Sequence, residues 1–211
     1  MTRVLIIGAN GAISKATIYS FLENTSYTLR LFLRDANRLP DYASDRIRVR
    51  EGDATNPEAV ARAMEDVDIV FAALSGDLAE AARTTVDAMQ KNNVKRLIFV
   101  TSLGIYNEVP GYFGTRVQAQ TNDYLSTYRQ AAEIIENSNL EYTIFRHAWL
   151  TDTNEIDYEI TKKDESFKGT EVSRKSVAAL AVQIAKNPTL HLKDNIGIHK
   201  PNTDFKKPRW Y

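Results

Sequence analysis

The chain of 211 residues contains no cysteine. This absence excludes disulfides, thiolate metal sites and a cysteine nucleophile, and it fits a reducing compartment. Long apolar runs are absent as well: the run before Gly8 covers only residues 4–7, which is too short for a signal peptide, and no later run approaches a membrane span. We therefore expect a soluble, cytoplasmic protein that does not interact with membranes.

An excess of charge of one sign is also missing, because 27 Lys and Arg residues balance 27 Asp and Glu residues. The chain as a whole has no electrostatic reason to bind nucleic acid or an anionic membrane. The three histidines, His147, His191 and His199, do not have the short spacing of metal ligands, and no H-E-x-x-H motif occurs. We expect a small-molecule ligand, no metal and no nucleic acid, in a monomer or a homodimer.

What the sequence does contain is a regular alternation of short β-rich runs and longer segments of helical period. We expect strands at residues 3–7, 28–33, 46–51, 68–72, 96–102 and 142–146, and helices around residues 78–89 and 177–184. Several of the strands are apolar on both faces, as in a parallel sheet covered by helices. The alternation predicts an α/β fold with a doubly wound parallel sheet, in a single domain over residues 1–211.

Two stretches, residues 103–118 and 151–169, interrupt this alternation. The first carries three glycines and Pro110, and the second is polar and acidic. Loops that follow the fifth and sixth strands would lie at the carboxyl edge of the sheet, where open α/β folds bind ligands. We therefore expect small substrate-side segments at about residues 103–118 and 147–175.

The most informative stretch is the turn Gly8-Ala9-Asn10-Gly11-Ala12-Ile13, which joins an apolar strand to a helical segment. Glycines let the backbone approach a pyrophosphate closely, and the N–H groups at a helix start attract its negative charge. We expect all six residues to bind the phosphates of a dinucleotide. The spacing G-x-x-G-x-x-S is looser than G-x-G-x-x-G, and a hairpin turn at Asn10-Gly11 is the alternative.

Two arginines follow the second strand and bear on the choice of cofactor. Arg34 and Arg38 could pair with the 2′-phosphate of NADP, which favours NADP, whereas Asp35 could hold the ribose of NAD, so that NAD also fits. After the third strand, Asp53 and Ala54 stand where the adenine would lie, with Asp53 as an acceptor for its amino group. The alternative for Asp53 is a helix cap ahead of the helix that follows.

With these motifs in place, the whole chain resembles an atypical short-chain dehydrogenase/reductase of the NmrA-like, NAD(P)H-binding subgroup. The resemblance rests on the glycine turn, Arg34-Asp35, Gly52-Asp53-Ala54-Thr55, Phe99-Val100-Thr101-Ser102, Ala132-Glu133, Tyr142-Thr143-Ile144-Phe145-Arg146 and Gly169-Thr170-Glu171-Val172-Ser173-Arg174. It implies a seven-stranded sheet of order 3-2-1-4-5-6-7 and a Rossmann, NAD(P)-binding fold. It also implies cofactor contacts from Ala72, Ala73, Leu74 and Ser75, and we add Thr101.

The catalytic pattern of such enzymes is incomplete in this chain. Ser102 stands at the position of the family's serine, but the alignment on Glu133 puts Leu125 and Arg129 at the positions of the tyrosine and lysine that transfer protons. Arginine stays protonated, although its charge could still hold a ribose or a phosphate of the cofactor. Tyr124 and Tyr128 flank the position, and they either pack as ordinary core residues or replace the missing tyrosine.

The segment after the sixth strand supplies His147, which could donate a proton to a substrate or serve as a structural histidine. Tyr106, Tyr112, Phe113 and Trp149 could form an aromatic wall for a planar substrate, or simply pack together. The hypothesis is therefore an NADP-dependent oxidoreductase that reduces a small planar acceptor of the flavin, quinone or azo type without the usual Tyr-Lys pair. The alternative is a non-catalytic regulatory protein that senses NADP(H).

Overall fold

The computed structural model of the protein describes residues 2–210, apart from the side chains of residues 122 and 123. The strands are β1 (Arg3–Ile7), β2 (Thr28–Leu33), β3 (Ile47–Glu51), β4 (Ile69–Ala72), β5 (Arg96–Ser102), β6 (Glu141–His147), β7 (Trp149–Thr151), β8 (Glu159–Thr161), β9 (Glu171–Ser173) and β10 (Asp194–His199). The helices are α1 (Ala12–Asn24), α2 (Pro57–Ala63), α3 (Leu78–Lys91), α4 (Gly111–Glu136) and α5 (Arg174–Lys186), with a short 3₁₀ helix η1 (Ala36–Arg38).

The described residues form one eight-stranded sheet and a small two-stranded sheet of β7 and β9. The order of the main sheet is β3-β2-β1-β4-β5-β6-β10-β8. Its first seven strands are parallel and reproduce the order 3-2-1-4-5-6-7 that the family resemblance implies. The eighth, β8, runs antiparallel to β10 and lies outside that expectation. The predicted doubly wound α/β fold is confirmed.

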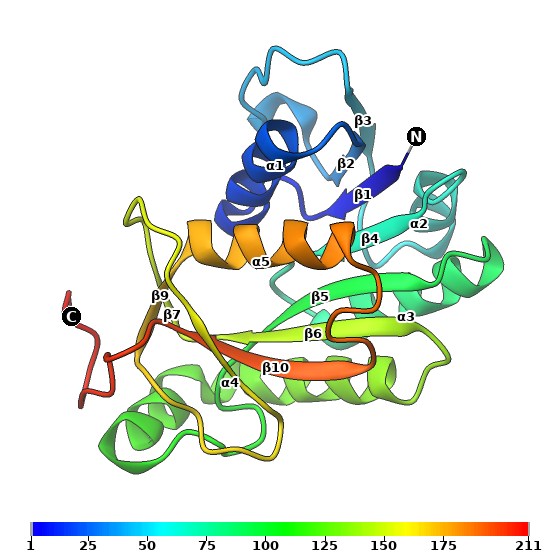
Figure 1. Ribbon diagram of the computed structural model, residues 1–211. Helices are drawn as coiled ribbons and strands as arrows, with labels where there is room; N and C mark the ends of the chain where they lie inside the picture. Colours follow the sequence, from blue (N-terminus) through cyan, green and yellow to red (C-terminus); the bar gives the residue numbers. More distant parts are fainter. Residues whose placement is uncertain (1, 211) are drawn as a thin grey trace.

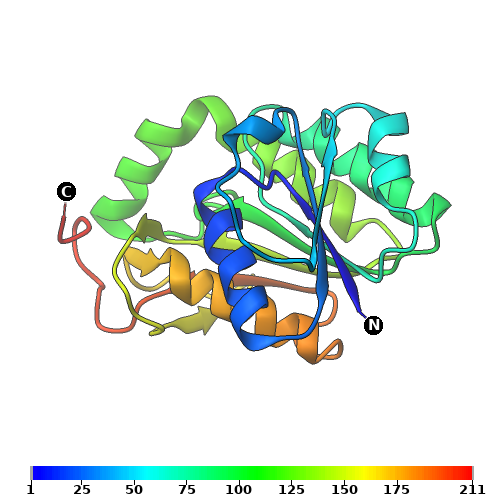
Figure 2. The same cartoon turned by 90° about the horizontal axis from the view of Figure 1, so that it is seen from above.

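Helices cover both faces of the sheet (Figures 1 and 2). α1 and α5 lie side by side on one face, and α2, α3 and α4 lie on the other. Apolar side chains from each strand alternate between two cores: Val4 and Ile6 pack toward α1 and α5, whereas Leu5 and Ile7 pack toward α2 and α3. Because β1 is buried on both faces, it reads in the sequence as a continuous apolar run.

Helix starts are fixed by short polar side chains. Asn56 accepts a hydrogen bond from the backbone N–H of Ala59 and caps α2, with Pro57 as the first helical residue, and Ser173 caps α5 by accepting from the N–H of Ser176. Asn and Ser are among the residues preferred at a helix N-cap. The cap of α2 is thus Asn56, and the alternative role of Asp53 as that cap is wrong.

The expected loop over residues 103–118 is only half correct, because α4 begins at Gly111. Pro110 precedes the first helical residue, a position that does not require its missing N–H group. Gly114 lies inside the helix, where a Cβ atom would meet the carbonyl oxygen of Val109 at 2.0 Å. Glycine at this position therefore allows the backbone of α4 to pack closely against the backbone of Val109.

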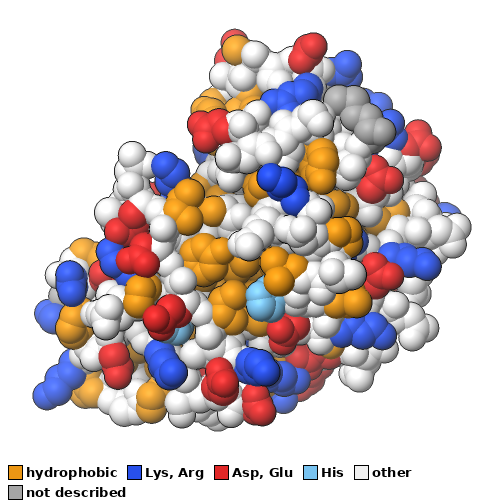
Figure 3. Space-filling view, viewed as in Figure 1, with side chains coloured by type: hydrophobic (Ala, Val, Ile, Leu, Met, Phe, Trp, Pro, Cys, Tyr) orange, Lys and Arg blue, Asp and Glu red, His pale blue; other side chains and the backbone are white. Residues whose placement is uncertain are grey.

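The surface carries charges of both signs, interspersed around hydrophobic side chains at the centre of the face shown in Figure 3. No helix of the described residues is long and apolar enough to cross a membrane. Within the same residues there is no group of three His, Cys, Asp or Glu side chains that could hold a metal ion.

Candidate cofactor site

A cleft of about 650 Å³ opens at the carboxyl edge of the parallel strands, across the point where the chain order reverses between β1 and β4. This is the place where open α/β sheets bind nucleotides. Of the residues expected to bind the cofactor or act in catalysis, the structure brings these to the lining: Gly8, Asn10, Gly11, Ala12, Ile13, Arg34, Arg38, Asp53, Ala54, Ala73, Leu74, Ser75, Thr101 and His147. Ala9 and Ala72 are fully buried beneath it.

Gly8 ends β1 in a left-handed conformation, with φ +81°. A Cβ atom at this position would lie 2.3 Å from the carbonyl oxygen of Ala73, so only glycine fits between β1 and the segment after β4. The N–H groups of Gly8 and Ala9 both donate to the carbonyl oxygen of Phe32, which ties the turn to β2. The alternative hairpin turn at Asn10-Gly11 is wrong, because α1 follows directly.

The start of α1 carries the features of an anion site. Gly11 provides no side-chain cap, and the first turn contains no acidic residue, so the first N–H groups of the helix keep their donor capacity. Asn10 Oδ1 and Ser14 Oγ are buried and have no hydrogen-bond partner in the described structure. A buried hydroxyl beside free helix N–H groups fits a pyrophosphate, which would supply the missing acceptor.

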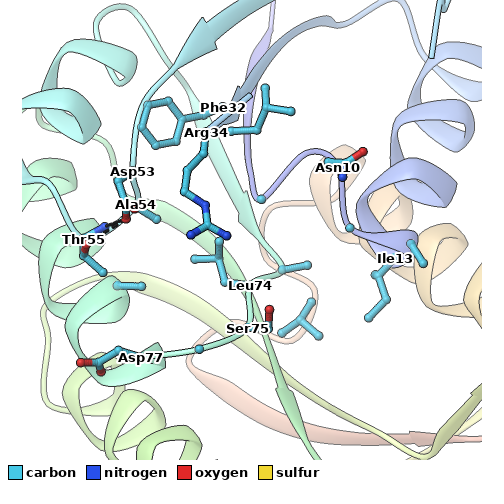
Figure 4. A pocket seen from close by; sticks show the side chains of 18 of the residues that line it. Asn10, Ile13, Phe32, Arg34, Asp53, Ala54, Thr55, Leu74, Ser75 and Asp77 are labelled. Atoms are coloured by element: carbon cyan, nitrogen blue, oxygen red, sulfur yellow. Dashed lines mark hydrogen bonds between the residues drawn. The ribbon is translucent and has the colours of Figure 1, made fainter. Parts of the chain in front are cut away.

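At the end of β2, Arg34 extends into the cleft on the side of Asp53, Ala54 and Thr55, opposite Asn10 and Ile13 (Figure 4). Asp35 also lines the cleft, and its carboxylate is used locally: Oδ1 accepts from the backbone N–H of Asn37 at 3.1 Å and caps η1. The acidic residue that could hold the ribose of NAD is thus engaged locally. Arg38, the last residue of η1, adds a second cation to this end of the cleft.

Asp53 lies at the adenine end. Its Oδ1 accepts from both the backbone N–H and the hydroxyl of Thr55, at 2.9 and 2.8 Å, and these bonds lower the pKa of the carboxyl group. The group is therefore ionised and remains an acceptor. Next to it, a Cβ atom on Gly52 would meet the Phe32 ring at 2.6 Å, so the ring packs tightly against the backbone of this end of the cleft.

The opposite end of the cleft is formed by Thr101, His147, Leu150 and Arg174. Nδ1 of His147 lies 2.8 Å from the carbonyl oxygen of Ala148, and since a carbonyl only accepts, Nδ1 carries the proton. Burial, together with the nearby Arg174 charge, lowers the pKa of His147. The ring is neutral near pH 7 with Nε2 as an acceptor, and the expected role of His147 as a proton donor stays a prediction.

The residues of the incomplete catalytic pattern lie outside the cleft. Ser102 is buried beside His147 in the β5·β6 register, and Leu125 packs in the core. Arg129 donates from Nε to Glu133 at 2.6 Å and from Nη1 to the carbonyl oxygen of Ile105 at 3.3 Å, and it does not reach the lining. The structure therefore does not support its expected contact with the cofactor, because Glu133 and the loop carbonyl of Ile105 hold the guanidinium outside the lining.

Tyr128 does line the cleft, where its hydroxyl lies 3.5 Å from the carbonyl oxygen of Leu74. Burial and the neighbouring Tyr124 raise the pKa of its phenol. In related enzymes a lysine lowers the pKa of the catalytic tyrosine, and Tyr128 experiences the opposite shift. It is therefore a neutral lining residue and lacks the properties of the missing base.

The four expected aromatic residues do not form one wall. Phe113 and Trp149 are in contact, with ring centroids 5.6 Å apart, and Trp210 packs on Trp149 at 6.2 Å. Tyr112 is exposed and borders a separate hollow of about 250 Å³ together with Phe113. Tyr106 lies elsewhere: its hydroxyl donates to Glu136 Oε1 at 2.9 Å, so its expected place in the substrate pocket is wrong.

Comparison with known proteins agrees with this geometry. A family model described as NAD(P)H-binding matches residues 8–188. The chain belongs to the NAD(P)H-binding family. It is an atypical short-chain dehydrogenase/reductase of the NmrA-like kind, and the predicted family is confirmed.

Three similar proteins illustrate the family. A Rossmann-fold NAD(P)-binding protein from Shigella flexneri is 42% identical, covers 99% of this chain and 98% of its own, and superposes with a TM-score of 0.85. A short-chain dehydrogenase/reductase from Veillonella parvula DSM 2008, in complex with NADP, is 27% identical over 99% of both chains, with a TM-score of 0.93. The uncharacterized sugar epimerase YhfK of Bacillus subtilis (strain 168) is 29% identical over 161 residues, 68% of this chain and 70% of that protein. NAD(P)H binding is accordingly the shared property of this family.

Sequence reasoning missed several residues of the cleft, of which Arg174 is the most consequential. The helix start at Ser173 was readable, and it places Arg174 in the first turn of the helix that follows β9, the partner of β7, which comes directly after β6 in the chain. That position points to the carboxyl edge of the sheet. Gly76, Asp77 and Leu150 also line the cleft without a distinct signal in the sequence.

Proposed function

We propose that this NAD(P)H-binding protein is an NADP-dependent reductase of a small planar acceptor of the flavin, quinone or azo type. The observation that supports the proposal is that, among the described residues, the two positions expected for the proton-transfer pair lie outside the nucleotide cleft: Leu125 is in the core and Arg129 is paired with Glu133. Epimerisation and alcohol oxidation need a positioned base, whereas a conjugated acceptor delocalises the incoming electrons and can take its proton from water.

The chain's own residues have three tasks in this reaction. The glycine turn would hold the pyrophosphate of the cofactor, Arg34 would hold its 2′-phosphate, and the ends of β5 and β6, with Thr101 and His147, would form the floor beside its reactive ring. Bound NADPH supplies a hydride. Water supplies the accompanying proton, so that the acceptor gains two electrons and two protons in total and NADP⁺ is left. Orientation and exclusion of competing geometries are the protein's contribution.

The test is NADPH oxidation under anaerobic conditions with a quinone, a flavin and an azo dye as separate acceptors. We expect acceptor-dependent oxidation that is lost in Gly8→Ala, because a Cβ at Gly8 collides with Ala73. Tyr128→Phe is the matched control, since it keeps the ring and removes the hydroxyl; it should retain activity. Binding of NADPH without oxidation of any of the three acceptors would refute the reductase and favour the NADP(H)-sensing alternative.

A further inference from the structure

Arg174 brings a cation to the end of the cleft that is remote from the 2′-phosphate site. It is the first residue of α5 and lines the cleft beside His147 and Leu150. Its Nη1 donates to Oδ1 of Asp152 at 2.7 Å, and this is the one hydrogen bond of its side chain within the described structure. Its Nε is buried and has no hydrogen-bond partner among the described residues. Most of the donor capacity of the guanidinium is therefore unused.

Asp152 does not neutralise this cation effectively. Its side chain is 87% exposed, whereas that of Arg174 is 24% exposed. An ion pair with one partner in water is strongly screened and stabilises little. The pair fixes the position of the guanidinium and leaves its charge available to a ligand in the cleft.

The order of the strands identifies the part of a ligand that Arg174 meets. The adenine end, with Arg34 and Asp53, lies over β2 and β3, and the cofactor crosses the switch point between β1 and β4. Arg174 lies beyond that point, beside His147 at the end of β6. This is the side of the nicotinamide and of any acceptor stacked on it.

The surroundings of Arg174 favour an anion. The carboxylates of the described lining, Asp35, Asp53 and Asp77, all lie after β2, β3 and β4, away from this end. Its neighbours in the lining are the apolar Leu150 and the neutral ring of His147. A negative group that enters here would face no lining carboxylate, and a guanidinium binds phosphate or carboxylate oxygens with paired hydrogen bonds.

We propose that Arg174 is a specificity-determining residue that binds an anionic substituent, a phosphate or a carboxylate, on the planar acceptor. This inference rests on the proposed function and narrows its substrate class to negatively charged conjugated acceptors. Asp152 is a positioning residue that orients the guanidinium.

A pair of flavins tests the inference, because FMN and riboflavin share the isoalloxazine ring and differ in the terminal phosphate. Protein saturated with NADP⁺ is titrated with each flavin, and binding is followed by flavin fluorescence. We expect FMN to bind at least about tenfold more tightly than riboflavin, as one charge-assisted contact provides. Arg174→Gln should abolish that preference by weakening FMN alone, and Arg174→Lys should retain part of it.

Lys175→Gln is the matched control, because Lys175 is the next residue of the helix, is exposed, and holds Asn154 outside the cleft. It removes the same charge and should preserve the FMN preference. Equal binding of both flavins by the wild type would overturn the inference, as would loss of both flavins in the folded Arg174→Lys variant. Weaker NADPH binding in Arg174→Gln with an unchanged flavin ratio would assign the arginine to the pyrophosphate and overturn it too. Because no hydride transfer is needed, failure of the reductase assay leaves this measurement intact.

Discussion

Arg146 and Glu108 form an ion pair in which both side chains are removed from water. Nη1 of Arg146 lies 2.6 Å from Oε1 of Glu108, and the two side chains are 0% and 5% exposed. Glu108 also accepts from the backbone N–H groups of Gly104 and Tyr106, and Arg146 donates from Nε to Asn195. The pair thus fastens the loop after β5 to β6 and β10.

The first prediction is that Glu108→Gln destabilises the fold by about 3–5 kcal/mol, because it leaves the buried Arg146 charge without its partner. Urea unfolding followed by circular dichroism measures the change. Glu133→Gln is the control, since it breaks the exposed Arg129–Glu133 pair and should cost less than about 1 kcal/mol. Similar losses for the two variants would contradict the difference in burial.

The second prediction concerns Gly8, where a methyl group would meet the carbonyl oxygen of Ala73. Gly8→Ala should abolish detectable NADPH binding and lower the melting temperature. Gly76→Ala is the comparison: Gly76 has φ +95°, but nothing lies within 4 Å of its Cβ position, so it incurs only backbone strain of about 1–3 kcal/mol. Thermal unfolding measures the stability of the two variants, and nicotinamide fluorescence measures their binding of NADPH. Gly8→Ala should lose more of both than Gly76→Ala.

Cofactor preference gives the third prediction. Arg34→Ala should raise the Kd for NADPH by about 10- to 100-fold, the effect of one charge-assisted contact, and leave the Kd for NADH nearly unchanged. Titrations of both nucleotides followed by nicotinamide fluorescence provide the measurement. Arg48→Ala removes a charge from β3 that hydrogen-bonds to Asp45 and Ile47 outside the cleft, and it should alter neither Kd. Parallel weakening of both nucleotides by Arg34→Ala would refute the 2′-phosphate contact.

The fourth prediction is a loss of stability in mild acid. Burial lowers the pKa of both His147 and His199 from the ordinary 6.5. The unfolded chain therefore binds protons at a pH where the folded chain does not. The free energy of unfolding thus has its full value above about pH 6.5 and decreases as the pH falls below it. Urea midpoints at pH 7.5 and 5.5 should differ, and the difference should shrink in His199→Gln. A urea midpoint that is higher at pH 5.5 than at pH 7.5 would contradict the lowered pKa values of the two histidines.

Much of the fold could be predicted because the determining signals are local. The strands β1, β2 and β5 have the bounds expected from their apolar runs, and Ser173 and Asn56 start helices as their side-chain chemistry dictates. The start of α4 was hidden because Gly111 and Gly114 resemble loop residues, whereas the second is needed for contact with Val109. β8 was hidden because three residues at an edge have too little periodicity to be recognised.

The cofactor half of the site was readable from the glycine turn and Arg34, since both act through backbone and charge at fixed offsets from a strand. The acceptor half was not. The position of the Tyr106 side chain depends on its hydrogen bond to Glu136 at the end of α4. The tautomer of His147 depends on the carbonyl oxygen of Ala148. The first relationship joins segments that are distant in the chain, and the second depends on how one ring is turned toward the next carbonyl; one sequence reveals neither.

The antiparallel strand β8 has a consequence for how molecules of this protein meet one another. It covers the edge of β10 and is itself an outer strand of only three residues, and β3 is the outer strand on the other side of the sheet. β3 carries the exposed charges Arg48, Arg50 and Glu51 in a run of five residues. Charged, short outer strands resist the joining of sheets between molecules, so the concentrated protein should resist fibril formation.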